Sequence, residues 1–293
     1  MLSRTIIHIK LKNAFYILFT GTKTGKKLLR KKADNFFSAF PDNSAEQHIY
    51  KGIEAFFGEP RYAKDKKYLY EIDVLRKKLA QDSSILQRTD FGAGVTSKLY
   101  KPVNKTTVAK LHKGSSMPQP LAMFLFEIIR HTKPVNCLEL GTCLGISGSY
   151  IAGALQLNGK GKLVTLEGDK NSAAIAKGNF AKLKLAENTT IVTGKFADTL
   201  PEVLLNLGHV DFALIDGHHN GAATLQYYEQ IKPYLSEKAI LVFDDIDWSS
   251  DMQNAWLKLQ QNKELYLFLD LGRMGICVYS KSSLPKAQLY LPV

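Results

Sequence analysis

The sequence predicts an α/β protein with a doubly wound sheet of seven strands, which ends in an antiparallel hairpin and follows a mostly helical N-terminal segment. From about residue 113 onward, short apolar segments alternate with amphipathic ones, the pattern of a parallel sheet with helices on both faces. The chain then ends in two apolar runs that lie too close together for a helix between them.

Five short apolar segments are expected to form the parallel strands. They are residues 135–140, 162–168, 189–194, 210–217 and 239–245. The amphipathic segments that follow are expected to be helices, over residues 146–157, 170–185, 198–207, 221–234 and 250–262. The last two strands are expected within residues 265–280, where the turn Leu-Gly-Arg-Met-Gly suits a hairpin.

The N-terminal part of the chain differs in charge. Residues 1–112 carry 22 Lys and Arg against 10 Asp and Glu, whereas residues 113–293 carry 17 of each kind. Apolar residues at helical spacing predict helices in the first part: Ile49, Ile53, Phe56 and Phe57 in one, and Leu69, Ile72, Leu75 and Leu79 in another. We therefore divide the chain into a basic segment, residues 1–112, and a second domain, residues 113–293.

The cysteines indicate the compartment. Cys137, Cys143 and Cys277 are odd in number and lack the spacing of a zinc site, which favours a reducing, cytoplasmic location without disulfides. The first 27 residues contain apolar side chains, but their polar residues disfavour a membrane span, and no small-residue cleavage site follows them.

A glycine-rich turn follows the first strand of the second domain. Gly141, Gly145 and Gly148 come directly after an apolar run that contains Glu139. A strand, a turn of small residues and a helix form a ligand cradle at the carboxyl end of a sheet. Glu167 ends the next strand, where an acid can accept hydrogen bonds from both ribose hydroxyls of an adenosine-containing cofactor. The alternative is an ordinary acid at a helix N-terminus.

The turn reads Gly-Thr-Cys-Leu-Gly-Ile-Ser-Gly and lacks the Gly-x-Gly-x-x-Gly pattern, which disfavours a nicotinamide cofactor. The segments "LELGTCLGISGSY", "LVTLEGD", "TGKFADTLPEVL", "VDFALIDGHH" and "AILVFDDI" resemble the class I S-adenosylmethionine-dependent methyltransferases, most closely the small-molecule O-methyltransferases of the catechol and macrocin type. The resemblance covers about residues 113–293 and implies a Rossmann-like fold that binds S-adenosyl-L-methionine.

By this resemblance, the methionine portion lies beside the glycine turn, the ribose on Glu167 and the adenine beside Phe196. The residues expected to line the cofactor are Glu139, Gly141, Thr142, Gly145, Ser147, Glu167, Gly168, Phe196, Ala197, Asp216 and His218.

Acidic residues end the fourth and fifth strands. Asp216, Asp244 and Asp245 are expected to meet at one rim, because the carboxyl ends of adjacent parallel strands lie together. Such oxygen ligands suit Mg²⁺ or another divalent cation. The alternative is that the adjacent pair caps the following helix. The metal-dependent relatives carry Lys or His three residues after the fourth-strand acid, so the resemblance implies His219 as the catalytic base. A solvated histidine pair is the alternative for His218 and His219.

The sequence thus predicts a metal-assisted O-methyltransferase that acts on a hydroxylated small molecule, with residues 1–112 as a substrate lid. The rivals are a metal-free methyltransferase acting on RNA or protein, a nicotinamide-dependent oxidoreductase, and a binding protein without activity. The basic stretch at residues 23–32 leaves peripheral membrane contact open, whereas nucleic acid is disfavoured because no aromatic platform accompanies it. A homodimer is compatible with the sequence.

Overall fold

The computed structural model describes residues 22–57, 63–89 and 103–292. The helices are α2 (Lys23–Phe37), α3 (Ala45–Phe57), α4 (Ala63–Gln81), α5 (Val108–Ser115), α6 (Gln119–Thr132), α7 (Ile146–Asn158), α8 (Lys170–Lys182), α9 (Phe196–Leu207), α10 (Gly221–Ile231) and α11 (Ser250–Gln261), with a 3-10 turn η2 (Lys232–Tyr234). The strands are β1 (Ile85–Thr89), β2 (Val103–Thr107), β3 (Asn136–Leu140), β4 (Lys162–Glu167), β5 (Thr189–Thr193), β6 (Val210–Ile215), β7 (Leu235–Phe243), β8 (Leu265–Asp270), β9 (Gly275–Tyr279) and β10 (Ala287–Tyr290).

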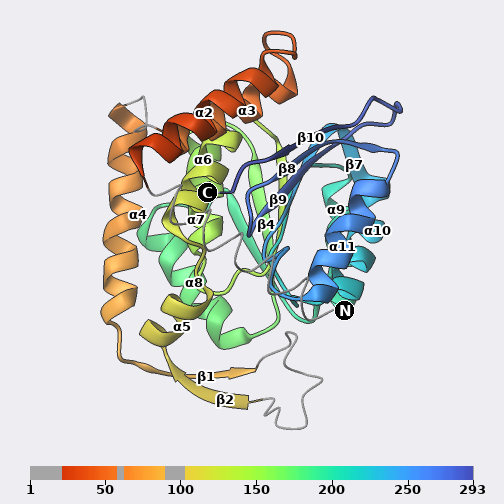
Figure 1. The fold of residues 1–293 in the computed structure, drawn as a ribbon. Coiled ribbons are helices and arrows are strands. Elements are labelled where there is room, and N and C mark those ends of the chain that lie inside the picture. Colours follow the sequence, from red (N-terminus) through yellow and green to blue (C-terminus); the bar gives the residue numbers. More distant parts are fainter. Residues whose placement is uncertain (1–21, 58–62, 90–102, 293) are drawn as a thin grey trace, which may run out of the picture.

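The central sheet confirms the predicted fold class. Its strand order is β10-β8-β9-β7-β6-β3-β4-β5, and β9 is antiparallel to both of its neighbours, as expected for the terminal hairpin. The sheet has eight strands, one more than predicted, because β10 pairs in parallel with the edge strand β8. Helices α6, α7 and α8 cover one face of the sheet, and α9, α10 and α11 cover the other (Figure 1).

Local signals explain where several helices begin. The side chains of Asp169, Asn220 and Ser249 each accept a hydrogen bond from a backbone N–H in the first turn of α8, α10 and α11, which satisfies a donor that the helix itself cannot pair. Helix α9 begins at Phe196, two residues before the predicted start.

The N-terminal helices belong to the same hydrophobic core as the sheet. Phe37, Ile49, Ile53 and Ile72 are fully buried in a cluster that also contains residues of α6, α7 and β3. The division drawn at residue 113 falls inside α5 rather than in a linker. The side chains of Phe56 and Phe57, part of the predicted pattern, lie outside the described residues, as do residues 1–21.

Helices α2 and α3 lie at the end of the sheet away from the ribbon formed by β1 and β2 (Figure 1). Ala45 and His48 at the start of α3 line a cavity with Val135 and Ser236, which lie at the amino ends of β3 and β7. Because the predicted site lies at the carboxyl ends of the strands, these two helices do not cover it. No helix in the described part of the chain is long and apolar enough to cross a membrane.

Candidate functional site

The predicted site residues meet at the carboxyl rim of the sheet. Leu140, Ile215 and Phe243 lie side by side in the register of β3, β6 and β7, so the residues that follow them leave the sheet together. The backbone N–H of Asp216 donates to the carbonyl of Leu140 (2.9 Å) and that of Asp244 to the carbonyl of Ile215 (3.1 Å). The glycine turn and the acidic residues therefore lie on adjacent strands.

Gly141 is required by both conformation and space. Its φ is +108°, and a Cβ at this position would lie 2.1 Å from the carbonyl oxygen of Asp216. The backbone N–H groups of Gly141 and Thr142 both donate to the carbonyl of Leu166, at 3.0 and 3.1 Å. Gly145, with φ +76°, is the N-cap residue of α7. The turn thus packs directly against the end of β6.

Glu139, in β3 just before this turn, is fully buried. Its carboxyl oxygens accept hydrogen bonds from Ser147 Oγ and Thr165 Oγ1, each at 2.6 Å. Burial raises the pKa of Glu139 to about 7, although these two hydroxyl donors lower it. Thr142 Oγ1 lies 2.6 Å from Thr165 Oγ1 and extends the network. In this structure Ser147 and Thr165 hold the acid in place, and Thr142 acts through Thr165.

Glu167 ends β4, as predicted, and its carboxylate faces the same turn. It accepts hydrogen bonds from the backbone N–H of Cys143 (2.7 Å) and of Asp169 (2.8 Å). Burial raises the pKa of Glu167, against the two backbone donors. Each oxygen of a carboxylate has a second lone pair, so the group retains acceptor sites for two ribose hydroxyls. Gly168 follows it in the turn before α8.

Asp169 is a residue that the sequence analysis missed. It is buried, and its Oδ2 accepts from the backbone and hydroxyl of Ser172, as the cap of α8. Its Oδ1 accepts from the backbone N–H of Thr89 in β1 (3.0 Å). Strand β1 is thereby fixed to Asp169, two residues beyond Glu167, beside the predicted cofactor site.

Phe196 and His218 meet through Tyr227. The rings of Phe196 and Tyr227 lie edge to face, with centroids 5.7 Å apart, and His218 Nδ1 lies 2.8 Å from the Tyr227 hydroxyl. A Cβ on Gly217 would lie 2.6 Å from the Phe196 ring. Ala197 is the next residue of α9. His218 is thus held by a partner, and the solvated-pair alternative does not describe it.

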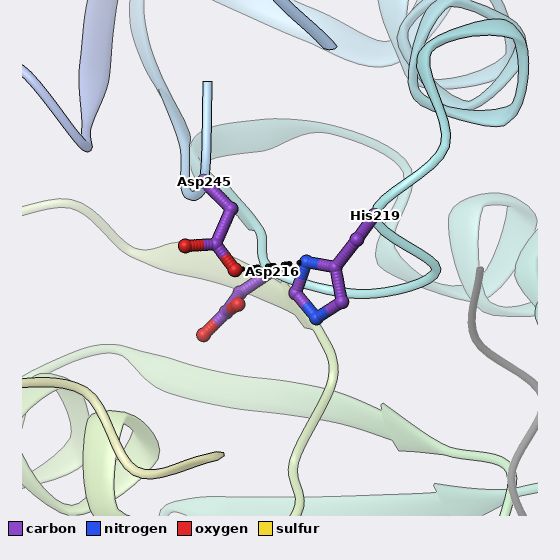
Figure 2. Close-up of side chains that lie close together, drawn as sticks. All are labelled: Asp216, His219 and Asp245. Carbon is purple, nitrogen blue, oxygen red and sulfur yellow. Dashed lines mark ion pairs between the residues drawn. The ribbon is translucent and has the colours of Figure 1, made fainter. Parts of the chain in front are cut away.

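Asp216 and His219 lie beside Asp245 at the rim (Figure 2). Asp216, His219 and Asp245 each offer one possible ligand atom, and these atoms lie within 4.8 Å of one another. His219 Nδ1 lies 3.1 Å from Asp245 Oδ2. Desolvation, with the carboxylates of Asp244 and Asp245, raises the pKa of Asp216 well above its ordinary value.

Asp244 differs from the prediction because an arginine binds it. Arg273, in the turn between β8 and β9, donates from Nε to Asp244 Oδ1 (3.1 Å) and from Nη2 to Oδ2 (2.7 Å). Its Nε also lies 2.9 Å from Asp245 Oδ1. Both oxygens of Asp244 are thus paired with Arg273, which the sequence analysis did not foresee, and the metal set of Asp216, Asp244 and Asp245 stays a prediction. His219 takes the place of Asp244 in the group that the structure brings together.

The chain matches a family described as "Methyltransferase domain" over residues 138–246. A catechol O-methyltransferase of Niastella koreensis is 42% identical over 82 residues, which cover 28% of this chain and 36% of that protein. The match thus spans little more than a third of the length of this relative.

Solved structures share the fold at low sequence identity. An O-methyltransferase from Bacillus cereus in complex with SAH has a TM-score of 0.53 at 17% identity, over 81% of this chain and 100% of that one. An SAH-bound methyltransferase from Podospora anserina has a TM-score of 0.51 at 15% identity, over 77% and 99%. The family match, the curated relative and the shared fold confirm the predicted resemblance to the class I S-adenosylmethionine-dependent methyltransferases.

Proposed function

We propose that this protein is an S-adenosylmethionine-dependent O-methyltransferase that acts on a hydroxyl of a small molecule, with His219 as the catalytic base. The observation that carries the proposal is the pair formed by His219 Nδ1 and Asp245 Oδ2, 3.1 Å apart, beside Asp216 at the rim. The similarity to a catechol O-methyltransferase and to SAH-bound methyltransferases supports the reaction type and the cofactor.

The cofactor would be held by the residues of the glycine turn and by those that follow β4, β5 and β6. Glu167 supplies acceptors for the ribose hydroxyls, Phe196 an apolar surface for the adenine, and the turn at Gly141 a close backbone approach. When bound, S-adenosylmethionine supplies an electrophilic methyl group on a sulfonium. The protein must then align the acceptor oxygen with that group and remove its proton.

Asp245 prepares His219 for this role. A carboxylate 3.1 Å from Nδ1 favours the neutral imidazole whose proton lies on Nδ1, which leaves Nε2 with a free lone pair. In Figure 2 that second nitrogen points away from Asp245. The carboxylate also stabilises the imidazolium that forms when Nε2 takes the proton of the acceptor.

Assistance by a divalent cation is a second candidate mechanism. Asp216, His219 and Asp245 form a mixed group of oxygen and nitrogen ligands. A bound divalent cation would lower the pKa of the acceptor hydroxyl. His219 cannot serve as both ligand and base through the same arrangement, so the two mechanisms are alternatives. Methylation of RNA or protein without metal remains a rival for the substrate class, whereas the missing Gly-x-Gly-x-x-Gly pattern counts against an oxidoreductase.

We also propose that the substrate lid predicted for residues 1–112 is confined to the region of β1 and β2. Thr89 of β1 is bound to Asp169, two residues beyond Glu167, and Asn171 donates to the carbonyl of Gln87 (2.6 Å). Helices α2 and α3 lie at the other end of the sheet (Figure 1).

A screen of hydroxylated metabolites with methyl-labelled S-adenosylmethionine, with and without chelator, tests the proposal. We expect His219→Ala to lower turnover by about 10²–10⁴-fold on an accepted substrate, while the affinity for SAH stays unchanged. Glu202→Ala, on the exposed surface of α9, is the matched control. Full turnover by His219→Ala would exclude His219 as the base, and transfer to RNA or protein in place of small molecules would favour the rival.

A further inference from the structure

Arg273 fixes the acidic residues of the rim to the turn between β8 and β9. Its guanidinium binds Asp244 through two parallel hydrogen bonds, 3.1 and 2.7 Å, and lies 2.9 Å from Asp245. Its backbone carbonyl accepts from the N–H of Ile246 (2.8 Å). Both the side chain and the main chain of one residue therefore hold the segment 244–246 in place.

These contacts restrain the side chains of Asp244 and Asp245 to different degrees. Asp244 is buried with both carboxylate oxygens on the guanidinium, so it cannot turn toward a metal without losing a paired geometry that favours arginine. Asp245 gives one oxygen to Arg273 and the other to His219. A continuous chain of contacts thus leads from Arg273 through Asp245 to His219. The backbone of Asp245 has φ +55°, a left-handed conformation that is uncommon for residues other than glycine.

We propose that Arg273 is the resident cation of this acidic cluster and the positioning residue for His219, so that methyl transfer proceeds without a divalent ion. This inference rests on the proposed function. Arginine keeps its charge at all physiological pH values. Its planar guanidinium pairs with both oxygens of Asp244 and also lies beside Asp245. A divalent ion would have to bind beside a guanidinium that already pairs with Asp244 and Asp245.

The reaction balances without a metal. The acceptor hydroxyl gives its proton to His219 Nε2, and its oxygen gives an electron pair to the methyl carbon. The bond from that carbon to sulfur breaks with its pair on sulfur, which turns the sulfonium into a neutral thioether. The proton stays on His219 until it is released to solvent. Asp245, itself paired with Arg273, holds the imidazolium in position.

Removing the guanidinium should expose a metal site. In Arg273→Met the full-length protein has three carboxylates and no resident cation, so we expect Mn²⁺, titrated alone by calorimetry, to bind at least roughly tenfold more tightly than to the wild type. Arg273→Lys keeps the charge but not the fork, and should bind Mn²⁺ as weakly as the wild type. Arg76→Met is the matched control, because Arg76 donates to the carbonyl of Met117 outside the cluster.

Activity gives the second readout. Wild-type turnover should be insensitive to chelator, and Arg273→Met should lose about 10²–10⁴-fold and regain part of it with Mn²⁺, a rescue that a purely structural role would not produce. Tight Mn²⁺ binding by the wild type, or an unchanged Mn²⁺ affinity in Arg273→Met, would overturn the proposal. The metal titration needs no methyl acceptor, so it tests whether Arg273 occupies the cation site even if no methyl transfer is found. Should Arg273→Met fail to fold, the Mn²⁺ affinity and chelator response of the wild type still decide it.

Discussion

Glu139 and Glu167 lie on neighbouring strands, and each is a buried carboxyl group held by specific donors. Glu139 accepts from two hydroxyls, whereas Glu167 accepts from two backbone N–H groups. Burial raises the pKa of both. Buried carboxyl groups with shifted pKa values gather at functional sites. Substitutions of these two residues therefore test the site directly.

The affinity for SAH should depend on Glu167. Glu167→Gln keeps the size of the side chain but has only one acceptor oxygen, so a ribose hydroxyl loses its partner at a cost of about 1–3 kcal/mol. Calorimetric titration with SAH should therefore show a Kd raised by about 5–150-fold. Glu202→Gln provides the exposed control. An unchanged Kd would remove Glu167 from the ribose site.

The free energy of unfolding should depend on pH through the titration of Glu139. Its folded pKa of about 7 lies above the ordinary value of 4.5, so the folded protein retains a proton that the unfolded chain releases. The stabilisation is fully present below pH 4.5 and is lost as the pH rises through about 7. The shift corresponds to roughly 3 kcal/mol at most.

Urea denaturation of the wild type and Glu139→Gln across this pH range measures the effect. We expect the unfolding free energy of the wild type to fall relative to that of Glu139→Gln as the pH rises, because glutamine does not titrate. Parallel curves for the two proteins would mean that Glu139 does not change its proton on unfolding.

At the scale of elements, the N-terminal helices are fitted closely to the domain that carries the site. Gly153 of α7 faces the Tyr68 ring of α4, and a Cβ there would lie 2.1 Å from the ring. Gly52 of α3 lies against Ile128 and Phe124 of α6, where a Cβ would be 2.9 and 3.2 Å from their side chains. Close packing at two glycines thus helps to place these helices.

The contact between α4 and α7 can be tested with one methyl group. Gly153→Ala should lower the unfolding free energy by about 1–3 kcal/mol, because the Tyr68 ring must move. Gly178→Ala in α8 is the control, since a Cβ there meets nothing within 4 Å, and it should raise stability by about 0.5–1 kcal/mol. Chemical denaturation measures both. Equal effects of the two substitutions would contradict the close approach of α4 to α7.

Helix α2 presents basic side chains to the surface. Lys26, Lys27, Arg30 and Lys31 are exposed around Leu28, which is 58% exposed, while Leu29, Ala33 and Phe37 are buried. We predict that this face binds anionic lipid surfaces, at about 1 kcal/mol for each cation close to the membrane.

Sedimentation with vesicles tests this expectation. The wild type should bind vesicles that contain phosphatidylglycerol and not those of phosphatidylcholine, and salt should weaken the binding. Replacing the four cations of α2 by Gln should abolish it, whereas Lys177→Gln with Lys182→Gln, on the exposed surface of α8, should not. Binding that survives the α2 substitutions would place the contact elsewhere.

The whole molecule should unfold as one unit. Residues of α2, α3 and α4 share a hydrophobic core with α6, α7 and the sheet, so the basic segment is not independent of the domain that follows. Trp248 and Trp256 both report on the second domain, whereas helical circular dichroism reports on all helices. We expect the two signals to show coincident urea transitions. An earlier loss of helical signal would indicate that α2, α3 and α4 unfold separately.

The cytoplasmic location and the homodimer stay predictions.

The sequence by itself determined the alternation of strands and helices from residue 135 onward, the terminal hairpin, and the rim at which Gly141, Glu167 and Asp216 meet, but it did not indicate β1, β2 or α6. These features follow from local periodicity and from a rule of parallel sheets, both of which can be read along the chain. Only the tertiary structure decided that Arg273 pairs with Asp244, that Asp169 holds the N–H of Thr89, and that β10 joins the edge of the sheet. The reason is physical: the two hydrogen-bonded pairs lie 29 and 80 residues apart, β10 lies at the edge of the sheet, and no local pattern specifies which distant group a side chain or a short strand will meet.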